Sequence, residues 1–399
     1  MELNRFPIKK ELSRGNDKQE PEVNFMLIAS FLSELPNPVA RSGHRVVTTK
    51  YNMICIGGMN TDLWNERSRQ MAWLPVLNEI WKFNLLTNEW KRVKSFGEFP
   101  LHLASHSMFL KGNLIFLFGG GSIPFSYNIS NDLYVLSLNT LLWRRLNCVG
   151  TIPTARYGHA MAVVNGVLYL CGGTNGHEFN MDLYSLPLKS NELQWTKHET
   201  EQNIIGRYQL AIIPFQDSLI MLGGSNNNQM FSMQELDAYS IPNRAWERLS
   251  TIRDRAKGVT TAVSYPQERR YHAVAIFGNV AYMCGGCGDS VIYDDIWALN
   301  LVTRTWQKFS TILPRPLFFH ACSVAPTGCL LIYGGILSME SKERNADVFK
   351  VWVKPQPLRV AAIEALQKRF PKMRYLPTTA LRLLNIPEEM INWLQDKVI

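Results

Sequence analysis

Residues 169–195 read YLCGGTNGHEFNMDLYSLPLKSNELQW. An apolar run ends there in two glycines, and a loop, a short alternating segment and a tryptophan follow. The glycine pair recurs six times, ending at Gly58, Gly120, Gly173, Gly224, Gly286 and Gly335. Successive pairs lie about 50 to 60 residues apart, a period typical of proteins built from repeated small sheets. The repeat therefore predicts one all-β architecture over most of the chain.

Every glycine pair except the last is followed by a strand-like segment that ends in a tryptophan. These tryptophans are Trp90, Trp143, Trp195, Trp246 and Trp306. In the second repeat, Leu133, Val135 and Ser137 share one face, while Tyr134 and Leu136 share the other. This period of two is typical of β-strands.

The diglycine, the separated aromatic residue and the tryptophan together resemble the kelch repeat. The resemblance implies a six-bladed kelch β-propeller, with one four-stranded antiparallel blade per repeat around a central channel. In such a blade the glycines permit tight turns, and the tryptophan packs between neighbouring blades. The predicted fold class is all-β, with a short C-terminal α-helical tail after the propeller.

The predicted domains are a disordered N-terminus at 1–21, the propeller at 22–354 and the helical tail at 355–399. The last repeat lacks a final strand with a tryptophan, and the apolar segment NFMLIASFLSELP can supply that strand from the N-terminal side. Residues 22–34 are therefore predicted to close the ring, which would leave no exposed sheet edge.

A second motif precedes each apolar run. It reads RSGH at 41–44, LASH at 103–106, RYGH at 156–159, RYQL at 207–210, RRYH at 269–272 and LFFH at 317–320. Five of the six copies end in histidine. We expect these histidines to satisfy buried backbone groups between blades, and we predict no metal site from them.

Arginines and aromatic residues of the same motif are candidate ligand-binding groups. Ring symmetry brings them to one face of the channel, where guanidinium groups among aromatic rings suit the carboxylate of a peptide end. The predicted residues that bind a substrate C-terminus are Arg156, Tyr157, Arg207, Tyr208, Arg269, Arg270, Tyr271 and Phe319. The alternative is that the arginines stack on aromatic rings of the blades and serve only the fold.

The charge is positive but dispersed, with 42 Lys and Arg against 33 Asp and Glu and a net charge of +9. A nucleic-acid-binding surface needs clustered charge, so neither nucleic acid nor a membrane is an expected partner.

The polar N-terminus lacks an apolar signal segment, and seven cysteines fit a reducing compartment, the cytoplasm or the nucleus. Cys284 and Cys287 form a lone CxxC pair. We therefore expect Cys284 to be a core residue like Cys55 and Cys171, with no metal or other cofactor.

Prolines divide the C-terminal segment into three predicted helices, which start near Pro357, Pro377 and Pro387, because proline fits the first helical turn. Leu381 and Leu384 are expected to face inward in the second helix. The first helix has an apolar stripe that consists of Leu358, Ala362, Leu366 and Phe370.

Part of this tail resembles the two boxes by which cullin-2 substrate receptors bind their partners. Leu358, Ala362 and Leu366 resemble the elongin C box, with alanine where the family usually has cysteine. The residues that resemble the cullin-2 box are Leu376, Pro377, Ala380 and Leu384. The resemblance implies elongin B/C and cullin-2 as partners. The alternative is a purely structural helical cap on the propeller.

The chain from about residue 33 to 395 resembles the kelch-repeat substrate receptors of cullin-2 ubiquitin ligases. The resemblance implies a non-catalytic receptor subunit whose propeller binds the extreme C-terminus of substrate proteins, often one that ends in glycine. On the matching motif positions it implies Arg207 for the carboxylate, with Arg270 and Tyr271 in the next blade. No nucleophile, acid–base pair or phosphate loop emerges from the sequence. The alternative function is a kelch interaction scaffold, cytoskeletal or signalling, without a ligase.

Overall fold

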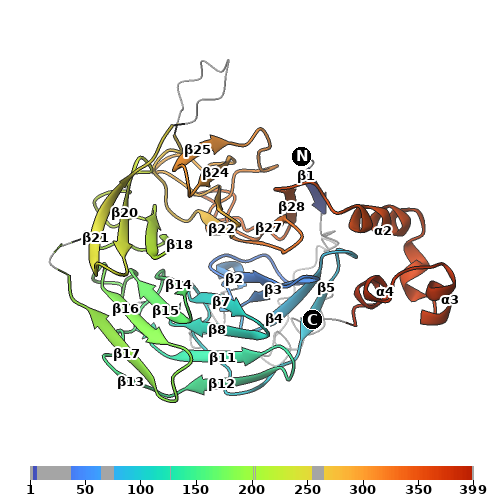
Figure 1. Cartoon of the computed structure of the whole chain (residues 1–399), viewed down its shortest axis with the longest axis horizontal. Helices are drawn as coiled ribbons and strands as arrows, with labels where there is room; N and C mark the ends of the chain where they lie inside the picture. The colour runs from blue at the N-terminus through green and yellow to red at the C-terminus, as the bar shows by residue number, and fades with distance from the viewer. Residues whose placement is uncertain are drawn as a thin grey trace, which may run out of the picture.

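The computed structural model of the chain describes residues 3–6, 37–63, 76–125, 127–200, 202, 204–253 and 265–397. These residues form six four-stranded antiparallel sheets arranged as blades around a central channel (Figure 1). The innermost strands of neighbouring blades contact each other around the full ring. The predicted six-bladed β-propeller is confirmed.

The first three blades come from the first three complete repeats. Blade 1 contains β2 (Arg45–Thr48), β3 (Asn52–Ile56), β4 (Ile80–Asn84) and β5 (Trp90–Val93). Blade 2 contains β7 (Ser107–Lys111), β8 (Leu114–Phe118), β11 (Leu133–Ser137) and β12 (Leu142–Leu146), with β6 (Phe96–Gly97) beside β12. Blade 3 contains β14 (Ala160–Val164), β15 (Val167–Cys171), β16 (Leu183–Pro187) and β17 (Leu193–His198), with β13 (Cys148–Gly150) beside β17.

The remaining three blades follow the same up-and-down order. Blade 4 contains β18 (Ala211–Phe215), β19 (Ser218–Leu222), β20 (Glu235–Ser240) and β21 (Ala245–Ser250). Blade 5 contains β22 (Ala273–Phe277), β23 (Val280–Cys284), β24 (Ile296–Asn300) and β25 (Thr305–Lys308). Blade 6 contains β26 (Ala321–Val324), β27 (Cys329–Tyr333), β28 (Val348–Trp352) and β1 (Leu3–Phe6). Short additional elements are β9 (Gly121–Ser122), β10 (Asn128–Ile129) and the 3-10 helix η1 (Thr61–Leu63).

The strand that completes blade 6 comes from the very start of the chain. β1 pairs antiparallel with β28, with Leu3 opposite Val351 and Phe6 opposite Val348. The sequence predicted residues 22–34 for this position and a disordered segment at 1–21; residues 22–34 lie outside the described residues. Apolarity favoured 22–34 in the sequence, but pairing along a sheet edge depends on main-chain groups, which every extended segment offers.

Two N-terminal deletions test which segment closes the ring. A chain without residues 1–20 is expected to melt at a lower temperature than the full chain, because β28 then loses its partner and presents an open edge. A chain without residues 1–36 should melt no lower than the shorter deletion. Circular dichroism melts check this result. If only the longer deletion lowers the melting temperature, the closing strand lies between residues 21 and 36.

The glycine pairs allow neighbouring blades to approach closely. A Cβ on Gly119 would lie 2.8 Å from Cε1 of His159 in the next blade, and one on Gly120 would lie 2.9 Å from Cβ of His106 in its own blade. Both glycines have positive φ, +65° and +95°, which also favours glycine. The Gly120 N–H of blade 2 donates to Arg156 O at 3.0 Å. The Gly335 N–H donates in the same way to Arg41 O at 2.8 Å, which joins the last blade to the first.

Four motif histidines, His44, His106, His159 and His320, are buried between blades, and His272 is half-buried. His44 Nε2 lies 3.1 Å from Tyr333 O across the junction between blades 1 and 6. Burial lowers the pKa of His106 and His272 to about 3 and that of His320 to about 4. These imidazoles are therefore neutral near pH 7.

Tryptophans and cysteines occupy the predicted core positions. Trp143 packs with Ile54 of blade 1, and Trp195 packs with Phe118 of blade 2, so each tryptophan fills the space between two blades. Cys171 and Cys284 lie at matching strand positions, directly before their glycine pairs, and Cys55 lies one residue earlier in its strand. All three are fully buried. All seven cysteines are free thiols.

The tail forms α2 (Leu358–Arg369), the 3-10 helix η3 (Pro371–Tyr375), α3 (Thr378–Leu383) and α4 (Glu388–Leu394). These helices lie at one side of the ring, beside β28 and β5 (Figure 1). Proline occupies the N-cap of each α-helix, which agrees with the boundaries that the prolines predicted. No helix in the described part of the chain is long and apolar enough to cross a membrane.

Candidate functional site

The first arginine of the motif lies inside its blade and not in the channel. Arg269 is fully buried; it pairs with Asp295, and its Nη1 donates to Gly285 O at 3.0 Å. Its guanidinium also lies 4.0 Å from the centre of the Tyr293 ring. Each donor of this guanidinium thus has a partner within the fold.

Arg156 and Arg207 have the same structural position. Arg156 Nη1 donates to Gly172 O at 3.0 Å, and Arg207 pairs with Asp237 and stacks 3.5 Å above the Phe231 ring. Arg156, Arg207 and Arg269 were predicted to bind a peptide carboxylate. The structure instead matches the alternative, in which they stack on blade aromatics and stabilise the fold, because their guanidinium groups are buried and already paired.

The second residue of the motif reaches one mouth of the channel. Tyr157, Tyr208, Arg270 and Phe318 each form a backbone bridge with the residue that follows the glycine pair of the same blade. Each of these four residues stands three positions before the innermost strand of its blade, so the predicted ligand-binding residues Tyr157, Tyr208, Arg270, Tyr271 and Phe319 lie at the end of the channel where those strands begin. We call the set formed by Tyr157, Tyr208, Arg270, Tyr271, Phe318 and Phe319 the channel mouth.

Aromatic contacts connect the channel mouth across blades 4 to 6. The hydroxyl oxygens of Tyr208 and Tyr271 lie 2.7 Å apart, and the Tyr271 and Phe319 ring centres are separated by 4.9 Å. Burial raises the pKa of Tyr271 well above its usual range, so this phenol stays a neutral hydrogen-bond donor. Arg270 is part-exposed and lies beside the Cys287 thiol, and its contact with a carboxylate among the described residues is long, 3.8 Å to the exposed Asp289. Its guanidinium is available to a ligand.

The third residue of the motif has a left-handed backbone in all six blades. Its φ lies between 55° and 67° at Gly43, Ser105, Gly158, Gln209, Tyr271 and Phe319. Inter-blade bonds hold this conformation; for example, Phe319 N–H donates to Tyr271 O at 2.8 Å. For bulky residues such as Tyr271 and Phe319 this backbone is strained, and such strain is typical of ligand-binding positions.

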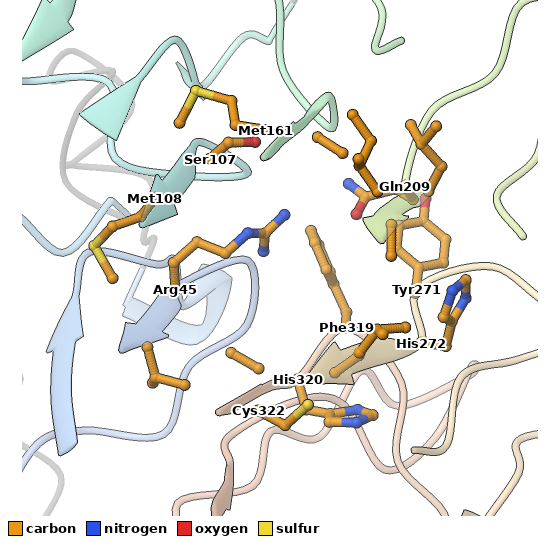
Figure 2. Close-up of a pocket in the computed structure, with 18 of the residues that line it drawn as sticks. Arg45, Ser107, Met108, Met161, Gln209, Tyr271, His272, Phe319, His320 and Cys322 are labelled. Carbon is orange, nitrogen blue, oxygen red and sulfur yellow. The ribbon is translucent and has the colours of Figure 1, made fainter. Parts of the chain in front are cut away.

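A cavity of about 180 Å³ continues from the channel mouth into the ring. Figure 2 shows its walls, with Arg45 and Gln209 extending from opposite sides toward one another. The sequence analysis missed both residues. A signal for Arg45 existed: it directly follows a motif copy, whereas the equivalent residues of the other blades are small, namely Ser107, Ala160, Ala211, Ala273 and Ala321.

The tail is anchored to blades 1 and 6 by one of its faces. Val360, Ile363 and Leu381 are buried in the same core cluster as residues of β3, β4 and β27. Trp393 Nε1 donates to Tyr51 O at 2.9 Å, and Asn84 Nδ2 donates to Trp393 O at 2.9 Å. The tail is therefore an integral part of the folded unit.

The opposite face of the tail exposes the residues that resemble the two binding boxes. The Leu358 side chain is 88% exposed and Leu366 is 39% exposed, with Ala362 exposed between them. Leu376 and Pro377 are exposed and Ala380 is half-buried. Leu384, which the sequence predicted to face inward with Leu381, is instead 60% exposed.

Comparisons with known proteins agree with this architecture. A model of the KLHDC2/KLHL20/DRC7 Kelch-repeats domain matches residues 28–224 and 182–352. Kelch domain-containing protein 10 from Xenopus laevis is 33% identical over 361 residues, which cover 90% of this chain and 86% of that protein. The human protein of that name is 33% identical over 362 residues, covering 90% of this chain and 80% of its own length. The chain is therefore homologous to Kelch domain-containing protein 10 and belongs to the kelch-repeat domain family.

Proposed function

We propose that this chain is the non-catalytic substrate-recognition subunit of a cullin-2–elongin B/C ubiquitin ligase. In this proposal the channel mouth binds the C-terminal peptide of a substrate, and the tail binds the ligase. The observation that carries the proposal is the exposed apolar stripe of α2. A helix that served only as a cap would bury its apolar residues, whereas exposed apolar patches are typical of interaction surfaces.

The exposed face of α2 is suited to binding in the apolar groove of a partner protein. Leu358 extends from the first turn, Ala362 leaves room for close approach one turn later, and Leu366 adds a second apolar contact. The other face of α2 remains in the core through Val360 and Ile363. The helix can therefore bind elongin C without leaving the propeller.

Leu376 and Pro377 lie after η3, in a separate part of the tail. Together with Ala380 and Leu384 they offer a second apolar surface, which we assign to cullin-2. The 3-10 turn between the two surfaces lets each one face its own partner. The tail thus has room for elongin C and cullin-2 at the same time.

The channel mouth has groups suited to a peptide carboxylate. Arg270 provides a positive charge, and the hydrogen-bonded pair of Tyr208 and Tyr271 hydroxyls leaves one neutral O–H free to donate to a ligand. The rings of Phe318 and Phe319 flank Tyr271 and form an apolar wall for the preceding residues of the peptide. A small last residue such as glycine, which the family resemblance implies, would let the carboxylate come close to these donors.

A peptide pair tests recognition of the C-terminus. A glycine-ended peptide with a free carboxylate is expected to bind with a Kd of about 1 µM, or about −8 kcal/mol. Its amide should bind at least about tenfold more weakly, because Arg270 then loses its charged partner. Fluorescence anisotropy measures both affinities. Arg144→Ala, an exposed change outside the mouth, is the control. Equal affinity for acid and amide would contradict carboxylate recognition.

A kelch interaction scaffold without a ligase is the second candidate function. The channel mouth supports the scaffold and the ligase receptor equally, since both functions need a site that binds another protein. Co-purification of elongin B and C with the expressed chain separates the two: the scaffold predicts that neither protein follows the chain through purification.

A further inference from the structure

We propose that the channel contains a separate carboxylate-binding site, in which Arg45 supplies the positive charge and Gln209 an amide donor. The site is the cavity that continues inward from the channel mouth. This inference goes beyond the proposed function, because it requires neither the ligase nor a peptide. The carboxylate can belong to a free small molecule or to the end of a chain that enters the channel.

Arg45 has no acidic partner among the described residues. Its one hydrogen bond there joins Nη1 to the backbone O of His44 at 3.0 Å. By contrast, the motif arginines have acidic neighbours within their blades, such as Glu79 for Arg41 and Asp295 for Arg269. A protein that pairs its other enclosed arginines leaves this one for a ligand.

No carboxylate among the described residues balances the charge of Arg45 inside the cavity. The wall combines apolar side chains such as Met108 and Met161 with neutral polar ones such as Ser107, and no Asp or Glu is among the described residues that line it. Burial lowers the pKa of Arg45 to about 10, so it remains charged at pH 7. A charge in such surroundings gains from a counter-ion, because the surrounding protein screens it less than water does.

Arg45 also differs from the residues at the same position of the other repeats. Directly after the motif, the five other blades have only serine or alanine, and those residues line the same cavity. Arg45 is therefore the one long side chain in a layer of small ones. Those small residues leave the space into which its guanidinium extends, as Figure 2 shows.

The chemistry favours a carboxylate over a phosphate. One guanidinium forms two parallel hydrogen bonds with a carboxylate and neutralises its single charge. A phosphate would bring up to two charges, and the histidines that line the cavity, His159, His272 and His320, are neutral near pH 7. Gln209, opposite Arg45, offers one further N–H donor without adding charge.

Thermal melts of the full chain test the site, with acetate as the probe. Sodium acetate is expected to raise the melting temperature saturably relative to sodium chloride at equal ionic strength, because a ligand that binds only the folded state stabilises it. Arg45→Gln should abolish this rise, and Arg45→Lys should keep part of it. Arg144→Gln, an exposed change, should behave as the wild type. Phosphate should give a smaller rise than acetate.

The Arg45→Gln chain is expected to fold, because the change removes an enclosed charge without an acidic partner among the described residues. In chloride it should melt at or above the wild-type temperature. An acetate-dependent rise that persists in Arg45→Gln overturns the proposal. So does a wild type that acetate does not stabilise, or one that phosphate stabilises more than acetate does.

Peptide binding then identifies the source of the carboxylate. If Arg45→Gln weakens binding of the glycine-ended peptide at least about tenfold, the peptide end reaches Arg45. If acetate acts through Arg45 and the peptide does not bind, the ligand is a free carboxylate, and the proposed function fails while this site stands. If the peptide binds equally to wild type and Arg45→Gln but acetate has no effect, this site fails and the proposed function stands.

Discussion

Arg269→Ala is expected to destabilise the propeller by about 3–5 kcal/mol, because it leaves Asp295 buried without its cation. It also removes the hydrogen bond to Gly285 O and the contact with the Tyr293 ring. Chemical denaturation followed by tryptophan fluorescence measures the change in the free energy of unfolding. Loss of peptide binding by this variant would follow from unfolding and not from a lost contact to the peptide.

Arg270→Ala is the matched control, one residue along the chain. Arg270 is part-exposed, and its contact with a carboxylate among the described residues, Asp289, is long, so its removal should change the free energy of unfolding by less than about 0.5 kcal/mol. It should nevertheless weaken binding of the glycine-ended peptide by about 2 kcal/mol or more. If Arg269→Ala folds normally and only it loses peptide binding, the buried arginines bind the ligand after all, and our assignment is reversed.

Leu358→Arg is expected to remove elongin C binding while the propeller keeps its melting temperature. The Leu358 side chain is 88% exposed, so the charge stays in water in the free protein. In the complex the same charge would be buried in an apolar groove, which costs several kcal/mol. Pull-down of elongin B/C together with a thermal melt of the free chain checks both parts of this expectation.

Two control variants, one at Leu383 and one at Ile363, distinguish a partner-binding surface from a structural cap. Leu383→Arg introduces the same charge at a side chain that is 85% exposed but outside the predicted elongin C stripe, and it should leave elongin C binding intact. Ile363→Arg places the charge on the anchored face of α2, where the side chain is 6% exposed, and it should lower the melting temperature. If Leu358→Arg lowers the melting temperature as Ile363→Arg does, the tail is a structural cap.

The sequence by itself determined the architecture and its repeat. The glycine pairs predict six blades because only glycine tolerates both the positive φ and the close approach of a histidine, as at Gly119 and Gly120. The tryptophans predict the filling between blades, and the prolines predict the helices of the tail. Each of these features depends on the local backbone geometry or packing that one residue type favours, so it can be predicted from the sequence.

The tertiary structure decided which residues of a motif face the ligand. In the copy RRYH, Arg269 lies inside the blade, whereas Arg270 and Tyr271 belong to the channel mouth. The sequence alone cannot tell which of two adjacent arginines is buried and which faces a ligand, because this depends on where the chain enters the innermost strand. The sequence distinguishes Arg45 from the small residues at the same position of the other blades, but only the closed ring shows that this position lines the cavity.

The structure likewise decided which face of the tail is exposed. Leu358, Ala362 and Leu366 share one side of α2, but Val360 and Ile363 offer a second apolar surface. The helical period shows which side chains share a face. When both faces of a helix carry apolar side chains, contacts with the rest of the fold determine which face is buried. Here blades 1 and 6 bury Val360 and Ile363, and Leu358 and Leu366 on the other face stay exposed.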